Sequence, residues 1–542
     1  MKAFALILLS VLLVPAIALS QDEGLVRQLD TKEEQLEKLW ADYWTTDREI
    51  AVGNDKLSTV PIRQRIRDVL TEPEFLAKLR AAHLDDPTLE RRRQLFLQEA
   101  IEARITADTE LARLVEEIER DEGAIRYQVG ERKLTRAELN NIVGHEPDRA
   151  LRRAAWEARA QITVLTGERV RKAMKLRDAL GQRHAGRAFS DFMLERKQTD
   201  RKRLMAWFEE IRRETEADYK KLLERMRREL KVEKVEPWDL EYYFSTLTAG
   251  FEETLLPPDD AWPRIQKLSR ALGFDFEKLG TDVVIADITF GGGTYPIYYG
   301  KQARIVVNKY KGIRFTDTLL HEAGHGLHFT LMREPSFLLR ANYAEAYGEG
   351  LGQVMALLLY RDEIAEPYFG LSAQQVRAIQ ERYRLKSMFD LRDTMADSQF
   401  EFAAYENPDQ DLVALYNRIY SEYLGVDMHG TATWAFDPFY STGPIYLQSY
   451  VLAEMVGRQI HHAVDQRFGR KWGPEAGRYL HEKFFVRGGR LPLDEIMKDG
   501  TGEPLTARYL IEAMKEPSEA SRALSTPRTA GGSGARLSPG GR

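Results

Sequence analysis

"TDTLLHEAGHGLHFTLM", residues 316–332, places three histidines and one glutamate in a run that otherwise has the pattern of a core-facing helix. His321 and His325 are four residues apart, so on a helix their imidazoles project from one face, one turn apart. Two such side chains can share a tetrahedral zinc ion. Glu322 lies beside the first histidine, where its carboxylate can accept a proton from a water near the metal and later deliver it to a leaving amine. The stretch therefore predicts a helix that carries part of a catalytic metal site.

Three other residues of the same stretch have simpler roles. Gly324 and Gly326 are poor helix formers, and their use here indicates that another element approaches the helix closely. His328 lies almost one further turn past His325. A fourth protein ligand would leave no open position on a catalytic zinc ion, so we expect His328 to pack and not to bind metal.

A catalytic zinc site needs a third protein ligand, and the sequence offers two candidates downstream. The segment "YAEAYGEGLGQVMALLL", residues 343–359, contains Glu345 and Glu349, one helical turn apart. Both stand at the start of an amphipathic run that could lean against the first helix. Residue spacing alone leaves the choice between them open.

The rest of the chain predicts a mainly α-helical protein. From residue 21 to about residue 230, apolar positions recur at three- and four-residue spacing among charges of alternating sign. Residues 281–311 are richer in β-branched and aromatic side chains and glycine, which predicts a small antiparallel sheet. Helical patterns return from residue 316 to about 515, and residues 516–542 have the composition of a disordered tail.

Composition and the N-terminus limit the possible partners and location. Residues 1–20 have an early lysine, an apolar run and small residues near Ser20, the layout of a secretory signal cleaved after that serine. We therefore expect a secreted or periplasmic protein without a stable membrane span after signal removal. The chain has no cysteine, and its net charge of −5 gives no electrostatic footprint for nucleic acid.

The spacing of these motifs resembles the gluzincin zinc peptidases of the angiotensin-converting-enzyme, thimet oligopeptidase and oligoendopeptidase type. His321, Glu322 and His325 are followed after 24 residues by a glutamate within "EGLGQVMAL", residues 349–357, similar to the family's E-A-I-G-D-V-L-A-L. The resemblance selects Glu349 as the third zinc ligand. It also covers "YYGKQARI", residues 298–305, and implies a large bilobed helical peptidase fold with a deep central cleft and a sheet next to the zinc helix.

The same resemblance assigns roles outside the metal helices. The strand before "YYGKQARI" binds substrate backbone in the family, which places substrate contacts on residues 292–295, including Gly292 and Thr294. An exposed strand edge can pair with an extended peptide through main-chain hydrogen bonds. The segment from Trp434 to Ala463 is similar to the one that carries a transition-state tyrosine. That role falls on Tyr450, which would donate a hydrogen bond to the oxyanion, with Tyr446 as a second candidate near the substrate.

Three departures from the family pattern affect what can be expected of the site. Where the family has a histidine that contacts the tetrahedral intermediate, this chain has Phe439 or Tyr440, and we consider the loop residue His429 as a catalytic replacement. The aspartate that follows the glutamate ligand by four residues is Gln353 here. Residues 431–457 contain neither lysine nor arginine, so the family's clamp for a peptide carboxylate is missing from this segment.

The sequence therefore predicts one domain over residues 21–515 with one zinc ion per chain. The expected activity is metal-dependent hydrolysis of short peptides, without a strict demand for a C-terminal carboxylate. A peptidyl-dipeptidase or carboxypeptidase on the same site is one alternative. A catalytically silent homologue that binds peptides is another. The oligomeric state is not predicted.

Overall fold

The computed structural model describes residues 2–54, 56–246, 254–288 and 290–515. The predicted C-terminal tail, residues 516–542, lies outside the described residues. The predicted signal, residues 1–20, falls mostly within the first helix, and its cleavage stays a prediction. Within the part of the chain that the structure describes, no helix is long and apolar enough to cross a membrane.

The N-terminal part is helical apart from one short hairpin. Its elements are α1 (Lys2–Ala51), α2 (Val60–Leu70), α3 (Pro73–Ala81), α4 (Pro87–Thr106), α5 (Thr109–Ala124), β1 (Tyr127–Val129), β2 (Arg132–Leu134), α6 (Arg136–His145), α7 (Arg149–Ala158), α8 (Ala160–Ala185), α9 (Phe189–Arg196), α10 (Arg201–Leu230) and α11 (Pro237–Thr246).

A three-stranded sheet and a second helical region follow. These elements are α13 (Pro258–Ala271), β3 (Thr281–Ala286), β4 (Gly292–Tyr298), β5 (Gln302–Asn308), α14 (Gly312–Leu331), α15 (Phe337–Ala341), α16 (Glu345–Ala356), η1 (Leu357–Tyr360), α17 (Asp362–Ile364), η2 (Ala365–Phe369), α18 (Ala373–Glu406), α19 (Leu412–Leu424), η3 (Trp434–Phe436), α20 (Phe439–Thr442), α21 (Gln448–Phe468), α22 (Pro474–Leu480), η4 (His481–Phe485), α23 (Leu493–Thr501) and α24 (Arg508–Met514). The predicted mainly helical fold class is confirmed.

Local sequence signals explain where the long helices begin and end. Asp200 caps α10 by accepting a hydrogen bond from the Arg203 amide, which satisfies one of the free donors of the first turn. Ser372 and Gln375 form a reciprocal capping box at the start of α18, the longest helix after α1. Gly425 ends α19 in the left-handed conformation that glycine adopts without a steric penalty.

The three-stranded sheet differs in one respect from the expected antiparallel sheet. Strands β4 and β5 form the predicted antiparallel hairpin, but β3 pairs with β5 in parallel, and the strand order is β3-β5-β4. The physical reason is the connection: the chain between β3 and β4 crosses to the far side of β5, so β3 takes the remaining edge. Strand β4 therefore lies at an edge of the sheet.

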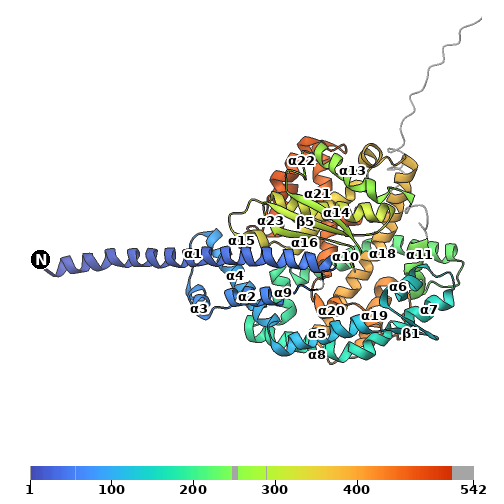
Figure 1. The fold of residues 1–542 in the computed structure, drawn as a ribbon, viewed down its shortest axis with the longest axis horizontal. Coiled ribbons are helices and arrows are strands. Elements are labelled where there is room, and N and C mark those ends of the chain that lie inside the picture. The colour runs from blue at the N-terminus through green and yellow to red at the C-terminus, as the bar shows by residue number, and fades with distance from the viewer. Residues whose placement is uncertain (1, 55, 247–253, 289, 516–542) are drawn as a thin grey trace, which may run out of the picture.

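The helices form two halves, which lie in the upper and lower parts of Figure 1. One half contains the three-stranded sheet with α14, α16 and α21, and the other contains α5 to α8 and α19. Helix α18 connects them, because it contacts α21 in the first half and α8 and α19 in the second. This arrangement agrees with the bilobed architecture that the sequence predicted.

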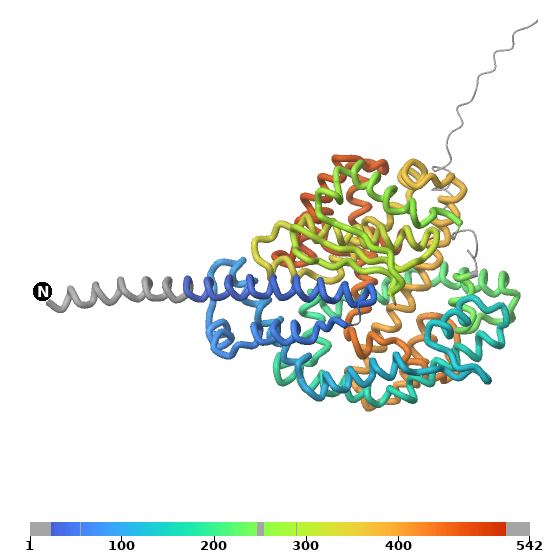
Figure 2. Tube along the Cα trace, in the orientation of Figure 1, coloured from blue at the N-terminus to red at the C-terminus, as the bar shows by residue number. Residues whose placement is uncertain are grey.

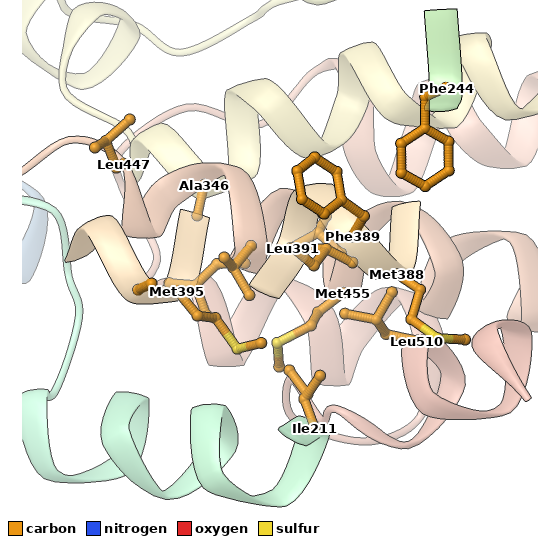
Figure 3. Packing of buried hydrophobic residues seen from close by; sticks show 14 of the residues in the cluster. Ile211, Phe244, Ala346, Met388, Phe389, Leu391, Met395, Leu447, Met455 and Leu510 are labelled. Atoms are coloured by element: carbon orange, nitrogen blue, oxygen red, sulfur yellow. The ribbon is translucent and has the colours of Figure 1, made fainter. Parts of the chain in front are cut away.

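The largest hydrophobic core extends through both halves. Around α18 it brings together side chains from α10, α11, α16, α21 and α24, including Ile211, Phe244, Ala346, Met455 and Leu510 (Figure 3). Because these residues pack against one helix, α18 and the elements around it form a common support for the site described below.

A smaller core joins the end of α1 to the sheet. Trp44 of α1 makes an edge contact with the ring of Tyr295 in β4, and Ala51 packs against the cluster that contains Ile297 and Val306. Figure 2 shows α1 running alongside the strands. Helix α1 therefore covers one face of β4, while α14 packs against β4 and β5.

Candidate metal centre and its cleft

Helix α14 carries the two histidines and is buried on most of its surface, which is typical of a helix that crosses a core. Two glycines let α16 lie directly against it. A Cβ on Gly324 would approach the Leu351 carbonyl oxygen to 2.5 Å, and a Cβ on Gly352 would lie 2.7 Å from the His321 ring. Any larger residue at either position would separate the helices. The close approach predicted for Gly324 is therefore present, and it carries Glu349 to the histidines.

The three expected ligands lie together. The Nε2 atoms of His321 and His325 are 3.0 Å apart, and the Glu349 Oε2 lies 3.3 Å from the first and 3.7 Å from the second. Among the described residues, these three form the group of His, Asp and Glu side chains whose donor atoms lie within 4.8 Å of one another. Two imidazoles and a carboxylate are the donor set of many catalytic zinc sites.

The electrostatics of this group favour a cation. Burial alone would raise the pKa of Glu349, but the hydrogen bonds and charges of His321 and His325 hold it well below its usual range. Burial alone would lower the pKa of His321, yet its hydrogen bond to Glu349 raises that pKa to about 9. The three side chains thus stabilise positive charge where they meet, and a metal ion would bind there by displacing the His321 proton, because a ligand imidazole must be neutral.

The alternative ligand Glu345 has a different partner. Its carboxylate forms an ion pair with the ammonium group of Lys197, a side chain only 5% exposed. A buried lysine needs such a counter-charge, because an unpaired ammonium group would be strongly destabilised away from water. In this arrangement Glu345 neutralises Lys197, and the carboxylate one turn later faces the histidines.

Tyr446 supports the third ligand. Its hydroxyl donates a 2.8 Å hydrogen bond to Oε1 of Glu349, which leaves Oε2 directed at the two imidazoles. The Lys197 ammonium group lies 5.0 Å from the centre of the Tyr446 ring. The sequence placed Tyr446 in contact with substrate. The structure places its hydroxyl on a ligand of the candidate metal site.

We predict that Tyr446→Phe weakens zinc binding about tenfold, the lower end of the cost of losing a group that orients a ligand. Without the Tyr446 hydroxyl, the Glu349 carboxylate can rotate, so Oε2 is no longer held in place as the oxygen that binds zinc. Competitive titration with a zinc-binding dye would measure the affinity. The matched control is Tyr450→Phe, which removes a hydroxyl from the next turn without touching Glu349 through a hydrogen bond. Equal zinc affinity in the two variants would contradict this role of Tyr446.

Tyr450 occupies the position expected of a group that acts on substrate. Its side chain is 40% exposed and lines the same cleft as His321 and Glu322. Partial burial of the ring and the negative charges of Glu349 and Glu322 raise the pKa of its phenol. The hydroxyl therefore stays protonated at neutral pH and can donate a hydrogen bond.

Glu322 lies on the wall of the cleft and is 7% exposed. Its Oε2 accepts a 2.7 Å hydrogen bond from the hydroxyl of Thr294, which comes from the edge strand β4. Gly292 faces the same carboxylate: a Cβ there would lie 3.0 Å from Cγ of Glu322. Gly292 and Thr294, predicted as substrate contacts, are thus both directed at Glu322.

The two remaining histidines of the sequence argument lie elsewhere. His328 is fully buried, and its Nε2 donates to the Arg487 carbonyl oxygen at 2.8 Å. Burial lowers its pKa to about 3, so this imidazole is neutral and packs as expected. His429 stacks on Trp238 with ring centres 5.5 Å apart, and its Nε2 lies 2.8 Å from the Glu236 carboxylate.

His429 therefore faces a partner outside the metal centre. The adjacent Met428 lines the cleft, but His429 is not among the lining residues of the described chain. Its backbone has a φ of 54°, in the left-handed region that residues other than glycine seldom adopt. The structure does not bring the catalytic replacement considered for the family's histidine to the metal centre.

Sequence reasoning missed Asp317, which lies one helical turn before His321. Its carboxylate lines the cleft, and burial raises its pKa to about 6, against the opposing effects of Tyr360 and His321. After Glu349 and Glu322, the charge of Asp317 also raises the pKa of His321. The four-residue spacing to His321 was the available signal.

The cleft has a volume of about 1410 Å³ and lies between the two halves of the molecule. It exceeds the roughly 300–1,000 Å³ of small-molecule sites, so an extended ligand of several residues fits its size. Its lining residues come from α6, α7 and α11 on one side and from β4, α14, α16 and α21 on the other, and α18 and α19 line it between them. The candidate metal centre thus opens into a space that both halves enclose.

Comparison with known proteins identifies the fold. No protein-family model matches the chain, and no curated protein matches its sequence. The M32 carboxypeptidase from Deinococcus radiodurans R1 superposes with a TM-score of 0.64 at 14% identity, over 90% of this chain and 97% of that protein. Metallocarboxypeptidase 1 from Trypanosoma cruzi gives 0.59 at 14% identity, over 90% of this chain and all of that protein.

These similarities show that the chain has the fold of metallocarboxypeptidases over nearly its whole length. A peptidase fold was expected from the sequence. The particular resemblance to the angiotensin-converting-enzyme group stays a prediction, because the two solved structures named above are carboxypeptidases.

Proposed function

We propose that this chain is a zinc-dependent metallopeptidase that hydrolyses short peptides. The observation that carries the proposal is the convergence of His321, His325 and Glu349 beside Glu322 in the wall of a peptide-sized cleft. The metallocarboxypeptidase fold supports it independently. Because residues 1–20 have the layout of a secretory signal, we propose that this activity lies outside the cytoplasm.

The residues of the cleft have complementary chemical roles. Zinc held by His321, His325 and Glu349 would supply a Lewis acid that polarises the peptide carbonyl and lowers the pKa of a bound water. Glu322 accepts a proton as the water oxygen bonds to the carbonyl carbon. It returns that proton to the amine nitrogen as the carbon–nitrogen bond breaks. The Tyr450 hydroxyl donates a hydrogen bond to the oxyanion in between.

Removal and replacement of the metal tests this proposal. We expect a chelator to abolish cleavage of a mixture of short peptides and stoichiometric zinc to restore it, with one zinc ion per chain by elemental analysis. Mass spectrometry of the products identifies the bonds that are cut. Full cleavage by the metal-free protein would overturn the proposal. A protein that binds zinc and peptides but cuts none of them would instead be the silent peptide-binding homologue.

A carboxypeptidase is the second candidate function. Residues 431–457 supply no cation for a peptide carboxylate, but Arg314 of α14 supplies one. Arg314 lines the cleft two helical turns before His321, and its guanidinium lies over the Tyr310 ring at 3.7 Å. Among the described residues, no carboxylate forms an ion pair with it. A peptide carboxylate could fill that place, because arginine pairs with carboxylates in a bidentate manner.

The same digestion separates the two modes. Each peptide is supplied both as the free acid and as the C-terminal amide. A carboxypeptidase would remove single C-terminal residues from the acids and leave the amides uncut. Internal cleavage of both forms supports the oligopeptidase that the sequence favoured.

A further inference from the structure

We infer that the edge strand β4 positions the catalytic base: Thr294 holds one oxygen of the Glu322 carboxylate, and Gly292 leaves the space in which that carboxylate lies. This inference rests on the proposed function, in which Glu322 is the base. It gives these two residues a role in the chemical step, where the sequence resemblance suggested contact with substrate.

The contact between Thr294 and Glu322 is direct. The Thr294 hydroxyl lies 2.7 Å from Oε2 of the carboxylate and 3.0 Å from the Glu322 main-chain oxygen. A hydroxyl has one proton to donate, and the carboxylate oxygen is both nearer and charged, so it is the stronger acceptor. Because the Thr294 Cβ is branched, its χ1 rotation is restricted and the hydroxyl is held in place.

Gly292 lies beside the same carboxylate, two residues before Thr294 in β4. Residues two apart in a strand point to the same side, so 292 and 294 both face α14. A Cβ at 292 would lie 3.0 Å from Cγ and 3.2 Å from Oε1 of Glu322, and 3.1 Å from a methyl carbon of Thr318. With neighbours on two sides, an alanine would displace the glutamate side chain.

Together the two residues select one orientation of the base. Thr294 donates to Oε2, and Gly292 leaves space beside Oε1, so each oxygen of the carboxylate has a fixed neighbour on the strand. A glutamate has three rotatable side-chain bonds, and fixing them before reaction removes an entropic cost from the chemical step. Since the Thr294 hydroxyl proton is donated to Glu322, it is not available for a hydrogen bond to substrate.

The test compares three variants of the full zinc-loaded chain on one quenched fluorescent peptide. Thr294→Val keeps the shape and removes the hydroxyl, so we expect kcat to fall on the order of tenfold to a hundredfold with KM nearly unchanged. Thr294→Ser restores the hydroxyl and should recover kcat to within about threefold of the unaltered chain. Thr330→Val is the matched control, because Thr330 is a buried threonine of α14 whose hydroxyl donates to the Gly326 carbonyl oxygen.

Zinc content and the thermal unfolding midpoint are measured for each variant. Loss of kcat in the valine variant with full zinc content and recovery by serine supports the inference. Unchanged kcat in Thr294→Val overturns it, as does a serine variant that is no better than valine. A Thr294→Val chain that loses zinc or fails to fold would show a structural role and also overturn it.

Gly292→Ala provides an independent measurement that does not involve the hydroxyl. We expect it to lower kcat at full zinc content by displacing Glu322, and unchanged kcat would overturn the role given to Gly292. Glu322→Gln in the same assay separates this inference from the proposed function. Only if that variant stays fully active does the base assignment itself fail.

Discussion

Glu322→Gln is expected to reduce kcat for peptide hydrolysis by roughly a thousandfold, within the range by which general acid–base groups accelerate reactions. Glutamine has nearly the same shape, and its amide oxygen can still accept the hydrogen bond from Thr294. It cannot take up the proton of the attacking water. The proposed ligand atoms belong to His321, His325 and Glu349, so the variant should keep its zinc.

The measurement pairs single-turnover kinetics with elemental analysis of the same preparation. Glu241→Gln is a suitable control, because Glu241 lines the same cleft but forms an ion pair with Arg159 on the far side. We expect the control to retain activity within about threefold, because the amide oxygen of glutamine can still accept a hydrogen bond from Arg159. Full activity of Glu322→Gln would remove the base from the proposed mechanism.

The meeting of the candidate metal ligands was predictable from sequence because part of its geometry is local. His321 and His325 lie on one helix, where a four-residue spacing alone places two side chains on one face. Glu349 comes from a second helix, and residue spacing could not distinguish it from Glu345. That distinction depends on Lys197, which lies 148 residues before Glu345 in the chain and pairs with it.

The contacts that the sequence could not predict are those between distant segments. Thr294 reaches Glu322 across 28 residues, through a strand whose register depends on the whole sheet. His429 lies near the right segment in sequence, but Glu236 and Trp238 hold it away from the metal centre. Strand β3 looked like part of an antiparallel sheet, because side-chain alternation is the same in parallel and antiparallel strands.

The choice between the two glutamates can be decided by metal binding. Glu349→Ala is expected to lower zinc affinity by more than the roughly 100-fold that loss of an outer, ligand-orienting contact can cost, because a direct ligand is lost. Glu345→Ala is the matched comparison, one turn earlier on α16. It leaves the ligand atoms in place but removes the counter-charge of Lys197.

The two variants should therefore fail in different ways. Without Glu345, the buried ammonium group of Lys197 loses its counter-charge, and the chain is destabilised by less than the roughly 3–5 kcal/mol of a fully buried pair, because Glu345 is 37% exposed. We expect Glu345→Ala to unfold at a lower temperature yet bind zinc with affinity close to that of the unaltered chain. Glu349→Ala should lose zinc while its metal-free form unfolds near the temperature of the metal-free parent. The reverse pattern, in which only Glu345→Ala loses zinc, would transfer the ligand role to Glu345. Tyr446 would then donate its hydrogen bond to a glutamate, Glu349, that does not bind the metal.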